Sequence, residues 1–402
     1  MKVPALWSLE TLKGIKMSDY KNLDSLYIAN TYARFPLQIV RGKGAFAIDE
    51  KGNKYIDLGT GIGVNALGYS NPYWKKAVKK QLNKVQHTSN LYYTKPCIDL
   101  AKFLCEKTGL KKVFFANSGA EANECAIKLA RAYGEKKGKD CFNIITLKNS
   151  FHGRTITTLS ATGQDVFHQK FNPLTQGFLY ANANDIKQVE TLVKNNNVCG
   201  ILVECVQGEG GVLPLDKEFV LGLQEICKNN DILFMIDEVQ TGNGRCGEYF
   251  AYMKFGVVPD VITTAKGLGG GLPIGACIMG EKAKSLLSFG DHGSTYGGNP
   301  VACAGALAVA NKIDGLLDEV NKKSQIIFDT LKGKSGIESV SGLGLMVGVK
   351  TTKPAKDVLK TCMENGVLVL TAKDKVRLLP PLNIPEKVLK KALNVLVNAC
   401  AI

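Results

Sequence analysis

The sequence predicts an α/β protein with one large domain around a mainly parallel sheet and a smaller α+β domain. In the middle of the chain, short runs rich in β-branched residues alternate with segments of helical pattern, which is typical of parallel strands joined by crossover helices. These runs are almost continuously apolar, as expected for strands that are buried on both faces. A chain of 402 residues is long enough for both domains.

Three regions follow from this pattern. We expect residues 1–75 to be an N-terminal segment that joins the small domain, residues 76–300 to form the large domain, and residues 301–402 to form the small C-terminal domain. The predicted strands of the large domain are 112–116, 143–148, 200–204, 232–236, 261–264 and 275–279, with helices at 121–136 and 217–229. The last hundred residues predict a helix from 300 to 312 and beyond, and strands at 344–350, 367–370 and 376–379.

The amino-acid composition argues against several classes of protein. The 12 cysteines are scattered without a C-x-x-C pair, which favours a reduced, cytoplasmic protein. The 4 histidines are isolated, so we expect no metal site. No apolar run reaches the roughly 18 residues of a membrane-spanning helix, and residues 1–16 lack a signal-peptide pattern.

The charge balance is basic, with a formal net charge of +15. The lysines are spread along amphipathic stretches without interleaved aromatic residues, which indicates solvated helix faces rather than a nucleic-acid surface. Such a charge would mildly attract anionic small molecules.

Polar residues directly after the predicted strands are the first candidates for a site, because open α/β sheets bind ligands outside the carboxyl ends of their strands. Asn117–Ala122 is a small-residue turn that leads into a helix. It predicts either a phosphate-binding site or an ordinary N-cap. Asp237, after the strand 232–236, could bind magnesium, cap a helix or pair with a protonated ring nitrogen. Lys266, after 261–264, lies among glycines that would let a flat ligand approach.

Together these three segments fit one cofactor, pyridoxal phosphate. This cofactor needs a phosphate cradle, a carboxylate that keeps its ring nitrogen protonated, and a lysine that forms an imine with its aldehyde. The same lysine, once displaced by substrate, is placed to move a proton, a step that typically contributes about 10² to 10⁴ in rate.

Four segments resemble the signature segments of class III aminotransferases, the fold-type I enzymes of the ornithine and acetylornithine group. These segments are 117–122, 237–242, 264–273 and 294–300, and the similarity runs from Tyr32 to Pro381. The resemblance implies a large pyridoxal-phosphate transferase domain with a smaller α+β domain.

The resemblance also implies roles for individual residues. Lys266 would be the Schiff-base lysine, Asp237 the partner of the pyridinium nitrogen, and Gln240 the partner of the ring hydroxyl. The phosphate would be held by Ser118, Gly119 and Ala120, and by Thr295 of the neighbouring subunit, while Phe151 would stack on the ring. The family pattern thus implies an obligate homodimer with shared active sites, in which His152 is a neighbour of the site rather than a base.

Two arginines are the expected substrate ligands. Arg154 resembles the carboxylate-binding arginine of the family, and its fork suits bidentate recognition. Arg377 resembles the arginine that binds an α-carboxylate of glutamate or 2-oxoglutarate, and Glu209 resembles the acid that neutralises it when the donor has no carboxylate there. Glu204 is expected to be structural, and Cys205 stands where the family motif has proline.

Among these enzymes, the chain looks closest to bacterial acetylornithine aminotransferases. Gly61 stands where ornithine aminotransferases have a tyrosine, which would make room for an acylated α-amine, and Ser294 is a further expected substrate contact. The resemblance implies transfer of the amino group of N2-acetyl-L-ornithine to 2-oxoglutarate, giving N-acetylglutamate 5-semialdehyde and L-glutamate in arginine biosynthesis. Ornithine, succinyl-diaminopimelate, 4-aminobutyrate or lysine donors, and an aminomutase, stay open as alternatives.

Two other classes of protein fit the sequence less well. Residues 55–66 resemble a dinucleotide-binding fingerprint. Residues 65–72, however, have a turn-forming composition where the fingerprint requires a helix. A non-catalytic binding protein of the same fold would have no need of Lys266, Asp237 and Arg377 together.

Overall fold

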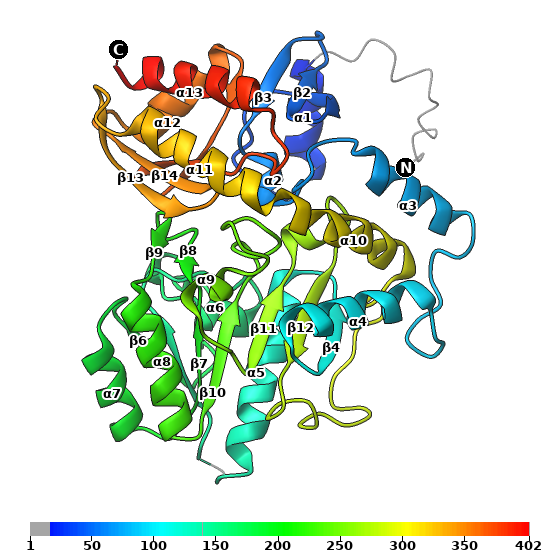
Figure 1. Cartoon of the computed structure of the whole chain (residues 1–402), viewed down its shortest axis with the longest axis vertical. Coiled ribbons are helices and arrows are strands. Elements are labelled where there is room, and N and C mark those ends of the chain that lie inside the picture. Colours follow the sequence, from blue (N-terminus) through cyan, green and yellow to red (C-terminus); the bar gives the residue numbers. More distant parts are fainter. Residues whose placement is uncertain (1–16, 139, 402) are drawn as a thin grey trace, which may run out of the picture.

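The structure is a computed structural model, which describes residues 17–138 and 140–401 (Figure 1). Residues 1–16, for which the sequence predicts no signal peptide, lie outside the described part. Within the described residues, the first element is α1 (Met17–Tyr27) and the last is α13 (Glu386–Ala401). The large sheet occupies the lower part of the view, and the C-terminal helices lie together with the N-terminal strands in the upper part.

The large sheet has seven strands among the described residues, in the order β4-β12-β11-β10-β7-β5-β6. They are β4 (Lys112–Ala116), β5 (Asn143–Leu147), β6 (Phe178–Ala181), β7 (Val198–Val203), β10 (Leu233–Asp237), β11 (Val261–Thr264) and β12 (Gly275–Met279). Within this set β12 runs antiparallel to both of its neighbours, β11 and β4, and the other pairs are parallel. The prediction of an α/β fold with a mainly parallel sheet is therefore confirmed.

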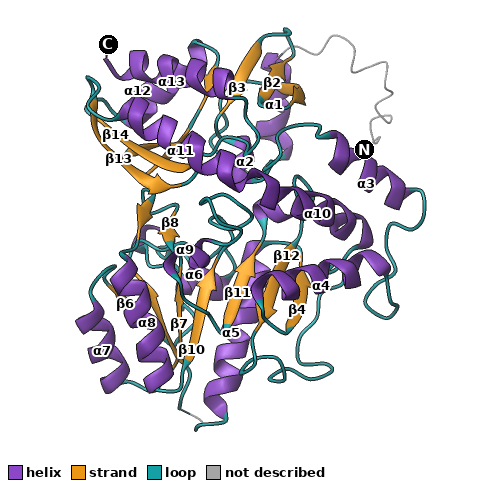
Figure 2. Ribbon diagram, in the orientation of Figure 1, coloured by secondary structure: helices purple, strands orange, loops and turns teal. Residues whose placement is uncertain are grey.

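Helices cover both faces of this sheet, which explains its continuous apolar strands (Figure 2). On one face α5 (Gly119–Glu135) packs on β7, β11 and β12, and Leu233 and Met235 of β10 belong to its core cluster. The alternate residues Phe234 and Ile236 belong to the second cluster, which includes α8 (Lys217–Asn229). A strand that buries both sets of side chains has no reason to alternate polar and apolar residues.

Further helices and a small ribbon complete the large-sheet region. Its other helices are α3 (Pro72–Leu82), α4 (Lys95–Thr108), α6 (Ile156–Ala161), α7 (Ile186–Asn195) and α9 (Ala251–Phe255), with the 3-10 turns η1 (Asp165–Phe167) and η2 (Lys266–Leu268). A two-stranded ribbon joins β8 (Val206–Gln207) to β9 (Leu213–Pro214).

The C-terminal region contains a four-stranded antiparallel sheet in the order β13-β14-β17-β16. Its strands are β13 (Ile337–Leu343), β14 (Met346–Thr351), β16 (Leu370–Ala372) and β17 (Lys375–Leu378). The helices of this region are α11 (Leu317–Leu331), α12 (Ala355–Glu364) and α13.

The N-terminal strands pair with a strand from the far end of the chain. The strands β1 (Ile39–Lys43), β2 (Phe46–Asp49) and β3 (Lys54–Asp57) form a sheet with β15 (Val367–Leu368), which lies parallel to β3. The sequence predicted a single strand over 367–370; this prediction is wrong, because the run divides at Val369 between β15 and β16, which belong to different sheets. The domain boundaries at residues 75 and 300 stay predictions.

One helical stretch, Pro300–Leu331, is long and apolar enough to cross a membrane on length and composition alone, and half of its apolar window is buried inside the protein. It consists of α10 (Pro300–Ile313), η3 (Asp314–Leu316) and α11. Because α10 packs against α3, α4 and η2, the stretch is arranged as core helices are.

Candidate active site

The site lies at the carboxyl edge of the large sheet, where the loops after three strands meet. Asp237 is the last residue of β10 and is paired in register with Thr263 of the parallel strand β11. Lys266 follows β11 after one intervening residue. The loop after β4 leads directly into the N-terminus of α5, so two opposite charges and a helix dipole converge at one edge.

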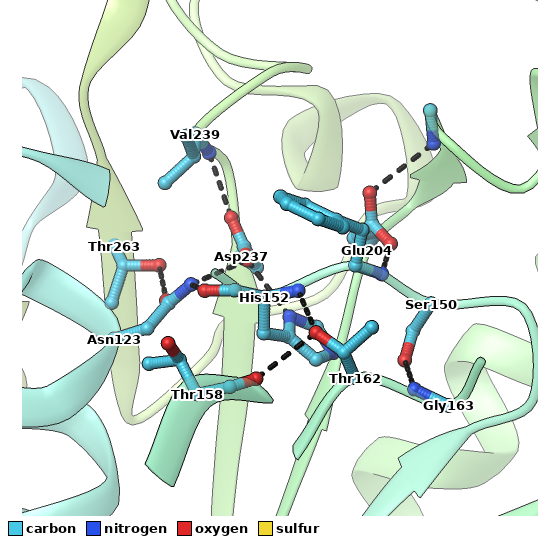
Figure 3. Close-up of polar contacts among 12 residues, drawn as sticks. Asn123, Ser150, His152, Thr158, Thr162, Gly163, Glu204, Asp237, Val239 and Thr263 are labelled. Carbon is cyan, nitrogen blue, oxygen red and sulfur yellow. Dashed lines mark hydrogen bonds and ion pairs between the residues drawn. The ribbon is translucent and has the colours of Figure 1, made fainter. Parts of the chain in front are cut away.

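Asp237 is 3% exposed and is held by three donors (Figure 3). Its Oδ2 accepts from Asn123 Nδ2 at 2.7 Å and from His152 Nδ1 at 2.8 Å, and its Oδ1 accepts from the backbone N–H of Val239 at 2.9 Å. Thr263 in turn donates to Asn123 Oδ1 at 2.6 Å, which fixes the orientation of the amide. The donors keep a buried carboxylate in one orientation, as its desolvation requires.

A second buried acid, Glu204, ties two loops of the site together (Figure 3). Its Oε1 accepts from the backbone N–H of Phe151 at 2.9 Å, and its Oε2 accepts from that of Gly208 at 3.2 Å. Burial raises the pKa of Glu204 to about 7; nearby His152 opposes this shift, and Asp237 adds to it. The sequence assigned Glu204 a structural role, and these contacts describe what that role would be.

The backbone turn that carries Lys266 is unusual. Lys266 has φ +40°, a left-handed conformation that non-glycine residues rarely adopt and that is often found at functional sites. Its amine forms no hydrogen bond with any residue that the structure describes. Burial lowers the pKa of Lys266, and the nearby Glu209 carboxylate opposes this shift. A less protonated amine is a better nucleophile toward an aldehyde.

Tight packing holds this turn in place. A Cβ added to Gly269 would lie 2.0 Å from the carbonyl oxygen of Leu272, so only glycine fits there. Trp74 of α3 donates its Nε1–H to the carbonyl of Gly269 at 2.9 Å. The short turn α2 (Thr60–Gly63) packs against the same segment.

Arg377 of β17 enters the site from the C-terminal sheet. It is 3% exposed, and its Nη1 lies 2.5 Å from Glu209 Oε1 and donates to Gln240 Oε1 at 3.1 Å. Burial acts to raise the pKa of Glu209, but Arg377 outweighs that effect and lowers it overall. The Nε of Arg377 has no hydrogen-bond partner among the described residues. Gln240 therefore contacts this ion pair, and its predicted contact with a ring hydroxyl stays a prediction.

The β4–α5 turn provides free backbone donors. Ser118 is the N-cap of α5, and its Oγ accepts from the N–H of Glu121 at 3.2 Å. The N–H groups of Gly119 and Ala120 lie in the first turn, where a helix supplies no carbonyl partners. A Cβ on Gly119 would come within 2.5 Å of Val239, in the loop after Asp237, so the turn packs closely against the loop of the buried acid.

Arg154 lies against two aromatic rings. Its guanidinium carbon is 4.3 Å from the ring centre of Phe167 and 5.6 Å from that of Phe151, and the two rings meet edge to face with centres 5.8 Å apart. Arg154 itself is exposed. Cations at these distances from a ring face are attracted by its quadrupole.

The predicted residues of the 291–299 loop occupy two environments. Ser294 Oγ accepts from Asn117 Nδ2 at 3.2 Å, which places it beside the β4–α5 turn of its own chain. Thr295 and Tyr296 are exposed. The structure thus brings Ser294 to the site within one chain and leaves Thr295 on the surface.

These residues fit pyridoxal phosphate. A buried carboxylate oriented by three donors suits a protonated ring nitrogen, an amine with a lowered pKa suits imine formation, and a helix N-terminus with open N–H groups suits a phosphate. All three sit at the same edge of one sheet.

Comparison with known proteins agrees with this chemistry. The family model of class-III aminotransferases matches residues 27–400, and the chain belongs to this family. It is therefore an aminotransferase, and pyridoxal phosphate is its cofactor.

The chain is similar to the acetylornithine aminotransferase of Haemophilus ducreyi, with 52% identity over 94% of this chain and 97% of the relative. It is also similar to the succinylornithine transaminase of Salmonella agona, with 42% identity over 94% of this chain and 96% of that protein. The crystal structure of the ornithine aminotransferase from Toxoplasma gondii superimposes with a TM-score of 0.93 at 30% identity, covering 97% and 96% of the two chains.

Several residues of the site were not found from the sequence. The sequence predicts no role for Asn123, Trp74 or Glu238, and it predicts His152 only as a neighbour of the site, although His152 contacts Asp237 directly. Glu238 is fully buried and accepts from the Tyr252 N–H at 2.8 Å. A polar residue on an otherwise apolar helix face was the one available signal, and it applies to Asn123.

Proposed function

We propose that this enzyme transfers the δ-amino group of N2-acetyl-L-ornithine to 2-oxoglutarate, in the arginine biosynthetic pathway. The ion pair between Glu209 and Arg377 is the observation that carries the proposal. A donor with one carboxylate and an acceptor with two must share one site. An arginine with a removable counter-ion satisfies both, because a buried charge without a partner costs several kcal/mol.

The residues have the following proposed roles. The cofactor, when bound, supplies an aldehyde and an electron-withdrawing ring. Asp237 would keep the ring nitrogen protonated, Phe151 would stack on the ring, and Gln240 would hydrogen-bond the ring hydroxyl. The turn Ser118–Gly119–Ala120 binds the phosphate through its backbone N–H groups. Lys266 would hold the cofactor through its aldehyde, and, once the substrate amine displaces it, its free amine would be placed to carry the proton at the substrate carbon.

Substrate recognition is divided between the two arginines. We assign the α-carboxylate of the donor to Arg154, which has no acid partner among the residues described. Arg377 binds the α-carboxylate of 2-oxoglutarate after Glu209 turns away. Ser294 is placed beside the β4–α5 turn and is assigned to the acyl-ornithine.

The preference for an acylated donor is supported by the segment beside the lysine turn. Gly61 has φ +63° and lies in α2, which packs against η2, where Lys266 begins the turn. A side chain at this position would be strained as well as bulky. The 52% identity to an acetylornithine aminotransferase points the same way.

A panel of amine donors tests the substrate. We expect kcat/KM to be highest for N2-acetyl- or N2-succinyl-L-ornithine, with free ornithine at least about a hundredfold lower, because an acyl pocket and a charged α-amine are incompatible. The succinyl arm measures how far the site tolerates a larger acyl group, as the relative from Salmonella agona suggests. Equal or better turnover of free ornithine, 4-aminobutyrate or lysine would refute the assignment.

We also propose a homodimer in the cytoplasm. The exposed Thr295 supports a shared site, because the resemblance assigns it to the phosphate of the neighbouring subunit. The 12 cysteines are unpaired, which suits a reducing compartment.

Subunit complementation tests the shared site. Lys266→Ala and Thr295→Ala chains are each expected to be impaired, but a heterodimer of the two has one site with both residues intact. Mixing unfolded chains and refolding them together should restore activity well above the sum of the parents. Simple additivity would mean that each site uses its own Thr295, and a monomer in sedimentation would exclude sharing altogether.

A further inference from the structure

The two arginines of the site are held in opposite ways. Arg377 is paired with a carboxylate at 2.5 Å, so its Nη1 stays engaged and its charge neutralised until Glu209 leaves. Within the part of the chain that the structure describes, Arg154 forms no ion pair and no side-chain hydrogen bond. Its guanidinium instead lies 4.3 Å from the ring centre of Phe167.

This difference matters for binding an anion. An acid beside Arg154 would compete with a carboxylate ligand for the same N–H fork. An aromatic face attracts the positive charge without accepting the in-plane N–H donors, which stay free for a bidentate contact. A long exposed side chain also loses rotamer entropy when it binds, and a ring that already holds it reduces that loss.

Phe167 is itself fixed by its surroundings. It ends the turn η1, and its backbone N–H donates to the carbonyl of Gln164 at 3.0 Å. The Gln164 side chain donates to the carbonyl of Ser150 at 3.0 Å, one residue before Phe151. On the other side, His168 Nε2 contacts the carbonyl of Thr162 at 2.8 Å. The turn that carries Phe167 is therefore tied, through Gln164, to the loop that carries Phe151 and Arg154.

We propose that Phe167 is a positioning residue, which holds the Arg154 guanidinium in place while leaving its hydrogen-bond donors free for the donor's α-carboxylate. This inference rests on the proposed role of Arg154. It adds a specificity-determining residue outside the segments that resemble the family signature. It also explains how Arg154 can keep its donors free for a carboxylate in both half-reactions while Arg377 changes partner.

The simplest competing explanation is that Phe167 only supports the ring of Phe151, since the two rings meet edge to face at 5.8 Å. In that case a change at Phe167 would alter cofactor binding whether or not Arg154 is present. The two explanations therefore differ in a double-mutant cycle.

The experiment measures binding of N2-acetyl-L-norvaline to the cofactor-loaded enzyme by calorimetry. This compound has the α-carboxylate and the acyl group but lacks the δ-amine, so no transamination follows. Phe167→Leu should raise its Kd by about three- to tenfold, the range expected for loss of one cation–π contact. Phe167→Tyr, which keeps an aromatic face, should stay within about twofold of wild type. Phe167→Met serves as a second non-aromatic variant if Leu disturbs folding.

The same substitutions in an Arg154→Ala background decide the mechanism. We expect Phe167→Leu to have no further effect there, and the cofactor absorbance spectrum to be unchanged in all folded variants. Equal weakening in both backgrounds, or a Tyr variant as weak as Leu, would overturn the proposal. If wild type fails to bind N2-acetyl-L-norvaline, the proposed substrate is wrong, and the cycle is run with the unreactive analogue of the carboxylate donor that the panel identifies.

Discussion

The imidazole Nδ1 of His152 lies 2.8 Å from Oδ2 of Asp237, although 85 residues separate them in the chain. The ring is buried, and its Nε2 has no partner among the described residues. Because a carboxylate can only accept, Nδ1 carries the proton in this contact while Asp237 is ionised. The histidine thus orients the acid from the side opposite Val239 and shares the task with Asn123.

Replacing His152 tests this orientation. His152→Leu removes one of two donors to Oδ2, and loss of a buried hydrogen bond costs about 1–3 kcal/mol. We expect the Kd for pyridoxal phosphate to rise by about five- to a hundredfold, measured by absorbance titration of the cofactor-free protein. His152→Asn is the matched control, because its Nδ2 can replace the Nδ1 donor. An Asn variant that is no better than Leu would contradict the orienting role.

Removal of Lys266 separates chemistry from folding. Lys266→Ala should abolish multiple turnover, while the thermal midpoint of the cofactor-free protein should not fall. The physical reason is that burial lowers the pKa of Lys266, so the folded protein stabilises the charged amine less well than water does. Lys79→Ala, at an exposed position of α3, is the control and should retain wild-type turnover. Sustained turnover by Lys266→Ala, followed by glutamate formation, would remove the residue from the mechanism.

Arg377→Ala should impair one half-reaction selectively. The single-turnover rate with 2-oxoglutarate is expected to fall by about ten- to a hundredfold, the effect of one lost charge-assisted hydrogen bond. The rate with the amine donor should change by less than about threefold, since that donor leaves Glu209 in place. Stopped-flow absorbance of the cofactor follows both reactions. Equal losses in both directions would be incompatible with a switch at Glu209.

Glu209→Gln should have the opposite effect. Without the carboxylate, Arg377 has a buried charge that lacks a counter-ion, so a dicarboxylate should bind more tightly and compete with the amine donor. We expect stronger substrate inhibition by 2-oxoglutarate, with a lower inhibition constant in steady-state assays. Unchanged inhibition by 2-oxoglutarate in this variant would show that Glu209 does not compete with a carboxylate for Arg377.

Glu238 predicts a pH dependence of stability. Burial raises the pKa of Glu238 from 4.5 to about 7, and the Thr241 hydroxyl opposes this shift. Between these values the folded protein keeps a proton that the unfolded chain has released. The stabilising contribution is therefore complete below pH 4.5 and is lost as the pH rises through about 7.

Glu238→Gln cannot titrate, so its thermal midpoint relative to wild type should increase from about pH 5 to about pH 8. Glu386→Gln is the control. The hydrogen bond from Lys390 lowers the pKa of Glu386, so its titration lies below this window and its difference curve should be flat. A flat difference curve for Glu238→Gln as well would mean that Glu238 does not hold a proton that the unfolded chain has released.

Six of the seven described strands of the large sheet were predicted because they are largely apolar runs, whereas β6 (Phe178–Ala181) was not predicted. The bounds of β4, β11 and β12 agree with the predicted ranges to the residue. The break at Val369 could not be predicted, since nothing local in an apolar run tells which of two sheets each half will join.

The positions of Asp237 and Lys266 at the ends of their strands could be predicted, because the chemistry requires one residue type there; their roles stay predictions. Contacts between distant segments were not visible. His152 and Asn123 reach Asp237 only because the loops after β5 and β10 and the helix α5 meet at one edge of the sheet. Phe167 lies in an irregular turn, where sequence pattern says little about which way a ring will face.

The pairing of β3 with β15 sets an order of events during synthesis. Ile56 has Val367 as its neighbour, so the N-terminal sheet cannot be completed until nearly the whole polypeptide has left the ribosome. Until then one side of β3 is an open edge that can pair with another nascent chain. Truncations that remove residues after 366 should therefore yield aggregation-prone products, even though every strand of the large sheet would still be present.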